Sequence, residues 1–417
     1  MKASFIICRI SHYRILAPVI EEALARGWSV ECWHDYGHPK NGTKGYQFPQ
    51  LDQVPIFKNR QPILRSFRSQ EELEKLSVET KTDVVLGHDA SGKGLGEKFP
   101  CKYIEVQHNG ETFWGRSLEQ MQAATFTAMY SPWWLDYAVE HYEAVGGLNE
   151  RQDNVRQKLL KKAVFVGVPE LDRQRCLEPD VVRETYGIPK NKKVVCFLPF
   201  AAISSIAFWP ERIYLANNRL KQLFHIVTQR RFEYLPHVRH HWDDKTLAAS
   251  LRMFCDRNDA WLVVKSRKKT PVTSYLQNHA DLVLFDQAHY PATLFEILSV
   301  ADLTVSFHSN AVFASAAKGV PHYSIRIPID DFYDGETDRD RDGRLRMNNY
   351  FQRTPEGPFD FEGVVTAADI SEAITDLPDR DLASFALDPD RAKLYVSKFI
   401  GPNDGRSSSR LLDALEA

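Results

Sequence analysis

Residues 294–323, LFEILSVADLTVSFHSNAVFASAAKGVPHY, contain the pattern that most restricts what this chain can fold into. Apolar residues first recur at helical spacing, and the short β-branched run 303–306 follows. A second helix is expected over residues 312–318, with Gly319 just past its end, where glycine commonly terminates helices. Val320 and Pro321 then begin another strand. The stretch therefore predicts a helix–strand–helix–strand unit of an α/β fold.

The loop between this strand and the second helix is polar and consists of His308, Ser309 and Asn310. In open parallel sheets, a loop that joins a strand end to a helix N-terminus presents free N–H groups and the positive end of the helix dipole. An ordinary crossover without a ligand would look similar apart from the polar trio. The sequence therefore predicts an anion site here, with the ordinary crossover as the alternative.

The N-terminus shows the same alternation of strand and helix. A buried-type strand is expected over residues 3–8, a polar loop over 9–14, a helix over 16–26 and a second strand over 28–33. This order is the opening unit of a doubly wound parallel sheet. No GxGxxG motif follows the first strand, so a dinucleotide-binding site is only weakly indicated.

Polar residues follow the later strands of the first half. The carboxyl ends of strands are the edge where doubly wound sheets bind ligands. The residues expected at this edge are His88, Asp89, His108, Glu111 and Glu170. His108 and Glu111 are potential bases, and the glycine between them allows a ligand to approach the backbone.

The length of 417 residues is too great for one ordinary core and suits two domains of roughly 200 residues. Residues 177–193 are rich in proline and charge and are predicted to form a hinge, after which the apolar strand 194–199 restarts the pattern. We expect doubly wound Rossmann-like domains over residues 1–185 and 186–400, followed by a C-terminal helix over 401–417.

The composition excludes several classes of protein. Hydrophobic residues make up 43% and charged residues 26%, as in soluble globular chains, and the net charge of −2 argues against a general nucleic-acid binder. The six cysteines form no CxxC pair and are expected to be reduced. We recognise no signal peptide and no apolar run of about 20 residues, so a cytoplasmic protein is expected. Neither GxSxG nor a P-loop occurs, which leaves hydrolase and P-loop kinase functions unsupported.

Two charged clusters in the second half are further candidates. Residues 265–269, Lys-Ser-Arg-Lys-Lys, follow an expected strand and would either bind an anion or remain a solvated loop. Asp243 and Asp244 offer a carboxylate base or nucleophile, although capping of the next helix is slightly favoured. The histidines of residues 237–241 match no known ligand spacing, so no metal is expected.

Three segments together resemble nucleotide-sugar transferases of the two-domain GT-B type. Residues 107–112, Gln-His-Asn-Gly-Glu-Thr, resemble the Trp-His-Gly-Thr segment of CDP-glycerol glycerophosphotransferases. Residues 294–321 are similar to the donor-binding segment of that group, with Phe-His-Ser-Asn at 307–310 where Asp-Tyr-Ser-Ser is usual. Residues 399–410 are similar to the tail of surface-polysaccharide transferases, a class that also includes the β-Kdo transferases. The resemblance implies a GT-B-like α/β fold with two doubly wound domains facing a cleft.

The resemblance also implies roles for individual residues. The first domain would bind the acceptor and the second the donor, whose phosphate would be held by Lys265, Arg267, Lys268, His308, Ser309 and Asn310. An inverting mechanism needs a base in the first domain, for which His108 or Glu111 is expected. A retaining double displacement would need Asp243, Asp244 or Glu170 at the anomeric carbon. The family's His-Pro donor motif would fall near residues 265–267, which lack it.

The function implied is a glycosyltransferase that moves a sugar from a nucleotide donor to a capsule or lipopolysaccharide glycan. Kdo carried on CMP would suit the extra cations. The alternatives are a CDP-glycerol-type glycerophosphotransferase, a UDP-sugar 2-epimerase-like isomerase and a binding module without activity. No cofactor, metal or nucleic acid is expected. A lipid-linked acceptor would bring the protein to the inner face of the membrane, through Trp133 and Trp134, although packing of this pair against the following helix is favoured.

Overall fold

The computed structural model divides the chain into two compact units. It describes residues 1–37, 54–88, 99–108, 121–144, 152–172, 178–199, 244–267, 274–286, 292–307, 309–326 and 355–417, with a few single residues between them. Unit 1 comprises Met1–Arg175, Ala288–Ala292 and Val396–Ala417, and unit 2 comprises Cys176–Gln287 and Thr293–Tyr395. The expected boundaries were at residues 185 and 400. In the structure the first boundary follows Arg175, and the segment Val396–Ala417 belongs to unit 1.

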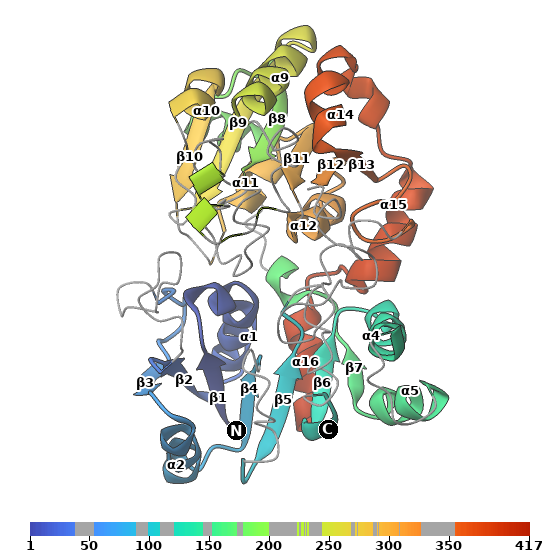
Figure 1. Ribbon diagram of the computed structural model, residues 1–417. Coiled ribbons are helices and arrows are strands. Elements are labelled where there is room, and N and C mark those ends of the chain that lie inside the picture. Colours follow the sequence, from blue (N-terminus) through green and yellow to red (C-terminus); the bar gives the residue numbers. More distant parts are fainter. Residues whose placement is uncertain are drawn as a thin grey trace. The chain divides into compact units, whose positions relative to one another are not determined.

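The described part of unit 1 forms a parallel sheet with the strand order β3-β2-β1-β4-β5-β6-β7 (Figure 1). Its strands are β1 (Lys2–Ile7), β2 (Ser29–Asp35), β3 (Ile63–Phe67), β4 (Val84–Gly87), β5 (Lys102–Val106), β6 (Phe126–Met129) and β7 (Ala163–Phe165). Its helices include η1 (Ile10–His12), α1 (Tyr13–Ala25), α2 (Gln70–Thr80), α4 (Pro132–Ala144), α5 (Gln152–Leu160), η5 (Pro169–Leu171), the π-helical turn Val396–Ile400 and α16 (Ser407–Glu416).

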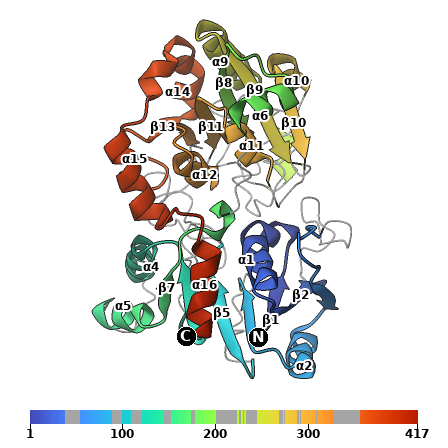
Figure 2. The ribbon, with the colours of Figure 1, turned by 180° about the vertical axis from the view of Figure 1, so that it is seen from behind.

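The C-terminal helix α16 belongs to unit 1 because its apolar face completes the core of that unit. Leu411, Leu412 and Leu415 are buried in the same cluster as the apolar face of α1. Figure 2 shows α16 beside α1 on one face of the sheet. Arg26, at the end of α1, adds an ion pair of 2.7 Å with Asp413. Helix α2 covers the opposite face through Leu73.

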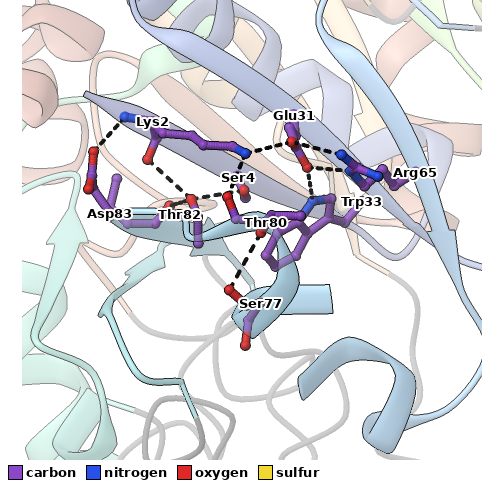
Figure 3. A network of polar contacts seen from close by, with 10 residues as sticks. Lys2, Ser4, Glu31, Trp33, Arg65, Ser77, Thr80, Thr82 and Asp83 are labelled. Carbon is purple, nitrogen blue, oxygen red and sulfur yellow. Dashed lines mark hydrogen bonds and ion pairs between the residues drawn. The ribbon is translucent and has the colours of Figure 1, made fainter. Parts of the chain in front are cut away.

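A buried carboxylate joins the first three strands of unit 1 (Figure 3). The side chain of Glu31 has no exposed surface and forms ion pairs with Lys2 at 3.0 Å and Arg65 at 2.7 Å. The indole of Trp33 donates a further hydrogen bond of 2.9 Å to the same carboxylate, and Lys2 also donates to the carbonyl of Thr80 at 2.6 Å. Burial favours a higher pKa for Glu31, but hydrogen bonds from Arg65, Trp33 and Lys2 hold that pKa below its ordinary value.

The described part of unit 2 forms a second parallel sheet with the strand order β10-β9-β8-β11-β12-β13. Its strands are β8 (Lys193–Leu198), β9 (Ala260–Arg267), β10 (Leu282–Asp286), β11 (Leu303–Phe307), β12 (His322–Arg326) and β13 (Val365–Asp369). Its helices include α6 (Pro179–Tyr186), α9 (Asp244–Arg257), α10 (Ser274–His279), α11 (Leu294–Leu298), α12 (Ala311–Ala317), α14 (Ile370–Thr375) and α15 (Pro389–Tyr395).

Both faces of the unit 2 sheet are covered by helices. Buried residues of α9, α10 and α14 share one core cluster with the sheet, and α6 and α11 contribute Val182 and Ile297 to a cluster on the other side. Coverage of both faces is typical of doubly wound parallel sheets and explains their nearly continuous apolar strands. The predicted α/β class, with two Rossmann-like sheets, is confirmed.

The stretch 294–323 folds largely as its pattern predicts. It supplies α11, β11, α12 and β12, and Gly319 has a φ of +71°, a left-handed conformation that favours glycine. The last strand begins at His322 instead of Val320, because Pro321 has no N–H to donate to a neighbouring strand.

A buried histidine fixes α12 to the sheet of unit 2. His322 is within hydrogen-bond distance of the hydroxyl of Ser306 on β11, at 2.9 Å, and of the hydroxyl of Ser315 on α12, at 3.2 Å. Ser315 in turn donates to the carbonyl of Ala311 at 3.0 Å. Burial lowers the pKa of His322 to about 3, so this side chain is neutral in the folded protein at physiological pH.

We expect His322 to make the folded state sensitive to acid. Its pKa of about 3 in the folded protein lies below the unfolded value of about 6.5, so its stabilising contribution is complete above pH ~6.5 and is lost as the pH falls toward the folded value. Between pH 7 and pH 5 this loss amounts to about 2 kcal/mol. Urea unfolding at pH 7 and pH 5 should show that a His322→Gln variant loses about 2 kcal/mol less stability over this range than the wild type. Equal losses in the two proteins would contradict this expectation.

Candidate functional site

Each sheet has a point at which the strand order reverses direction. In unit 1 this point lies between β1 and β4, and in unit 2 it lies between β8 and β11. The loops that follow these neighbouring strands diverge to opposite faces, and ligands of doubly wound sheets bind in the resulting crevice at the carboxyl ends. In unit 1 the residues in this place are those of η1 and His88. In unit 2 they include Ser309 and Asn310.

The reversal point of unit 1 gathers a cluster of three histidines, His12, His88 and His108. His12 ends η1 after β1, His88 follows β4, and His108 lies two residues past the end of β5. The ring centroids are 4.8 Å apart between His12 and His108, 5.4 Å between His88 and His108, and 6.0 Å between His12 and His88. The strand order β1-β4-β5 places these three strand ends next to one another, so residues up to 96 positions apart share one site.

A buried carboxylate orients one of the three rings. Nδ1 of His88 donates to Oε1 of Glu105 at 2.9 Å, and the hydroxyl of Tyr103 donates to Oε2 at 2.6 Å. The alternation of β5 explains this placement, since Tyr103 and Glu105 point to one face while Ile104 and Val106 enter the core on the other. The side chain of Glu105 is only 3% exposed, which fixes the carboxylate beneath the ring.

Positively charged groups lie near the His108 ring. Burial lowers the pKa of His108 well below its ordinary value, and the charges of His12, His88, Arg14 and Arg9 lower it further. Arg14 forms an ion pair of 2.9 Å with Glu170 in η5. The imidazole of His108 is therefore neutral at physiological pH and can accept or donate a hydrogen bond.

The predicted residues of unit 1 fall partly into this cluster. His108 lies within it, and Glu170 lies at its edge with its carboxylate engaged by Arg14. Glu111 lies outside the described residues. The sequence interpretation gave no role to His12 or Glu105. A carboxylate between apolar residues of a buried strand was the available signal for Glu105, because such a group requires a partner.

The predicted donor residues occupy the carboxyl ends of β9 and β11. Lys265 is buried and donates to the carbonyl of Ser266 at 3.2 Å, and Ser309 accepts from the amide of Ala311 at 3.3 Å. Asn310 directly precedes α12 and is half-buried. Strand β8 separates β9 from β11, so these ends are roughly 10 Å apart, which is two strand spacings.

The remaining predicted residues of unit 2 are described only in part. Asp244 is the first residue of α9, which fits the predicted helix start, and Arg267 is the last residue of β9. The side chains of these two residues, and all of Asp243, Lys268 and His308, lie outside the described residues.

Trp133 and Trp134 pack inside unit 1. Trp134 is fully buried and donates to the carbonyl of Phe399 at 2.7 Å. The ring of Trp133 lies 4.8 Å from that of Phe399 and stacks on Tyr137 at 5.0 Å. A membrane contact through Trp134 is therefore wrong, because the returning C-terminal segment covers its ring. Within the described ranges, no helix is both long and apolar enough to cross a membrane.

The part of the chain that the structure describes contains no group of three or more His, Cys, Asp or Glu residues arranged to hold a metal ion. The three-histidine cluster is therefore not such a group. Its imidazoles can exchange protons and form hydrogen bonds with the neighbouring carboxylate group.

Comparison with known proteins identifies the fold. No protein-family model and no curated protein sequence matches the chain. The wall teichoic acid polymerase TagF has a similar structure, with a TM-score of 0.53 and 12% identity over 100% of this chain and 88% of that one. UDP-GlcNAc 2-epimerase from Neisseria meningitidis bound to UDP-GlcNAc has a TM-score of 0.56 and 12% identity over 100% of both chains. The epimerase from Methanocaldococcus jannaschii has a TM-score of 0.52 and 11% identity, over 100% of this chain and 99% of that one.

The chain has the GT-B-type fold of these proteins, with two parallel α/β sheets. The predicted GT-B-like fold class is confirmed. At these identities the likeness concerns the fold alone, and the resemblance to β-Kdo transferases stays a prediction.

Proposed function

We propose that this protein transfers a group from a nucleotide-activated donor to an acceptor hydroxyl, and that the three-histidine cluster activates the acceptor. The observation that carries the proposal is the neutral His108 beside the carboxylate-paired His88, at the reversal point of the unit 1 sheet. Ligands of such sheets bind at this point, and neutral imidazoles there supply a general base.

The chemistry that the cluster can perform is proton removal from an alcohol. As the acceptor oxygen attacks the donor, its proton must pass to a neutral base within hydrogen-bond reach. His108 is the base that the sequence predicts, and His88 lies next to it with its Nδ1 atom engaged by Glu105. Arg14 is held at the same edge by Glu170 and supplies positive charge for an anionic substrate group.

We assign the donor to the reversal point of the unit 2 sheet. Ser309 and Asn310 lie there in the loop before α12, and Lys265 and Arg267 belong to β9, two strands away. The predicted set also includes Lys268 and His308. Two nucleotide donors are suggested by structural neighbours, since TagF was soaked with CDPG and the Neisseria epimerase holds UDP-GlcNAc. CMP-Kdo, with a surface glycan as acceptor, remains the third donor to test.

A thermal-shift screen tests whether the protein binds a nucleotide. CMP, CDP, UDP and GDP are compared with inorganic phosphate at equal concentration. The matching nucleotide, at 100 times its dissociation constant, is expected to stabilise the folded state by about 2.7 kcal/mol, while phosphate alone gives less. Active donors are then identified with CDP-glycerol, UDP-GlcNAc and CMP-Kdo. Absence of a shift with all four nucleotides would rule out the proposed donor class.

An isomerase is the second candidate, because the UDP-GlcNAc-bound epimerase matches this chain over the full length of both. Incubation with UDP-GlcNAc alone separates the two functions. Formation of a 2-epimer without any acceptor would establish the isomerase and contradict the transferase. Donor consumption that requires an added acceptor would do the reverse.

A further inference from the structure

We infer that Glu105 and His88 form a carboxylate–histidine dyad in which Nε2 of His88 takes the acceptor's proton, while His108 holds the acceptor hydroxyl as a neutral hydrogen-bonding neighbour. The inference rests on the proposed transfer reaction and divides the roles within its site. It assigns the base to a residue outside the segment that resembles known transferases, residues 107–112.

The hydrogen bonds of Glu105 determine which nitrogen of His88 carries the proton. Both carboxylate oxygens are occupied, Oε1 by Nδ1 of His88 at 2.9 Å and Oε2 by the hydroxyl of Tyr103 at 2.6 Å. A carboxylate accepts hydrogen bonds, so Nδ1 of His88 is the protonated nitrogen and Nε2 carries the lone pair. The His88 side chain is 16% exposed, so this ring, unlike that of His12 at 1%, reaches the surface of the site.

The charged groups around His88 and His108 differ. His88 faces the Glu105 carboxylate from β5, together with the rings of His12 from η1 and His108. His108 instead experiences the positive charges of Arg9 and Arg14 in addition to its burial. A nearby carboxylate stabilises an imidazolium, and neighbouring cations destabilise one. Glu105 is therefore placed to stabilise positive charge on His88 when this ring takes up the acceptor's proton.

An oxygen lone pair of the acceptor forms a bond to the transferred carbon or phosphorus atom of the donor. The bond from that atom to the nucleotide phosphate oxygen breaks, and its electron pair leaves with the nucleotide. The acceptor proton passes to Nε2 of His88, and the resulting imidazolium is stabilised by Glu105 through Nδ1–H. Release of that proton to water restores the neutral ring.

Selective ¹⁵N-histidine NMR of the full chain tests the dyad without any donor. His88 is assigned by its absence in His88→Gln. Its Nδ1–H tautomer is expected, and a Glu105→Gln variant, which removes the facing negative charge, should move its titration midpoint to lower pH. Glu170→Gln is the matched control, since it removes the same charge from a carboxylate that pairs with Arg14. An Nε2–H tautomer of His88, or a midpoint that does not move in Glu105→Gln, would overturn the dyad.

The kinetic arm separates proton transfer from a purely structural role. With an active donor and acceptor, Glu105→Gln is expected to move the acid limb of kcat/KM to lower pH and to reduce the plateau about 100-fold. A lower plateau with an unmoved limb would show that Glu105 only supports the fold and would overturn the assignment. If no donor is turned over, the proposed transfer fails, and the NMR result still decides whether the dyad exists.

Discussion

A His108→Gln variant is expected to retain its fold and nucleotide binding but to transfer the donor group about 10²-fold more slowly than the wild type, because the ring that positions the acceptor hydroxyl is lost. Glutamine preserves one donor and one acceptor but cannot replace the geometry of a neutral imidazole. Because the donor is assigned to unit 2 and His108 lies in unit 1, the loss should appear in kcat while the thermal shift with nucleotide is unchanged. Steady-state kinetics with the screened donor measure both effects.

Two further variants make this measurement specific. His279→Gln, at the end of α10 in unit 2, is the matched control and should alter kcat less than about twofold. Groups that act as one unit give non-additive losses, so His88→Gln combined with His108→Gln should be little slower than the worse single variant. A folded His108→Gln protein with wild-type kcat would remove this residue from the site.

Removal of both cations from the Glu31 network is expected to destabilise unit 1 by about 3–5 kcal/mol. In a Lys2→Met/Arg65→Met double variant, the carboxylate of Glu31 remains completely buried with only the indole of Trp33 as donor among the contacts of Figure 3. An uncompensated buried charge costs more than the lost ion pairs contributed. Additional replacement of Glu31 by leucine should therefore recover part of the loss. Urea unfolding of the three proteins measures these differences.

The pH dependence of the unfolding free energy tests the same network independently. In the wild type, the lowered pKa of Glu31 gives stability that is present above its unfolded pKa and is lost as the pH falls through the folded pKa. Without its cations, burial raises that pKa, so the double variant should become relatively more stable as the pH falls from 7 toward 5. Lys75→Met is the control, since its ion pair with Glu79 is exposed and should contribute less than about 1 kcal/mol. A double variant no less stable than this control would contradict the network's role.

Local patterns in the sequence were sufficient to predict the α/β class. Apolar runs and helical periods predict most of the elements over residues 294–323, and Gly319 adopts the left-handed conformation expected at a helix end. The polar residues that follow β4 and β5 were also predicted from the sequence, because a strand followed by polar residues is a local feature. These patterns depend only on residues a few positions apart, so they can be recognised without knowing how the rest of the chain folds.

Membership of the candidate site depended on contacts between distant segments. Glu105 appears in the sequence as one charge in an apolar strand, and only the pairing of β4 with β5 brings its carboxylate to His88. Glu170 was expected as a potential nucleophile; the fold pairs it with Arg14, and its catalytic role stays a prediction. The sequence predicted a helix near the C-terminus, and only the fold shows that its leucines complete the core of unit 1.

The sequence by itself thus determined the alternation of strands and helices and the polar character of the strand ends. The tertiary structure decided which strand ends are neighbours, which histidine faces a carboxylate, and which is surrounded by cations. The physical reason is that periodicity is a property of adjacent residues, while the order β1-β4-β5 and the charges around each buried ring arise only when the whole sheet is assembled.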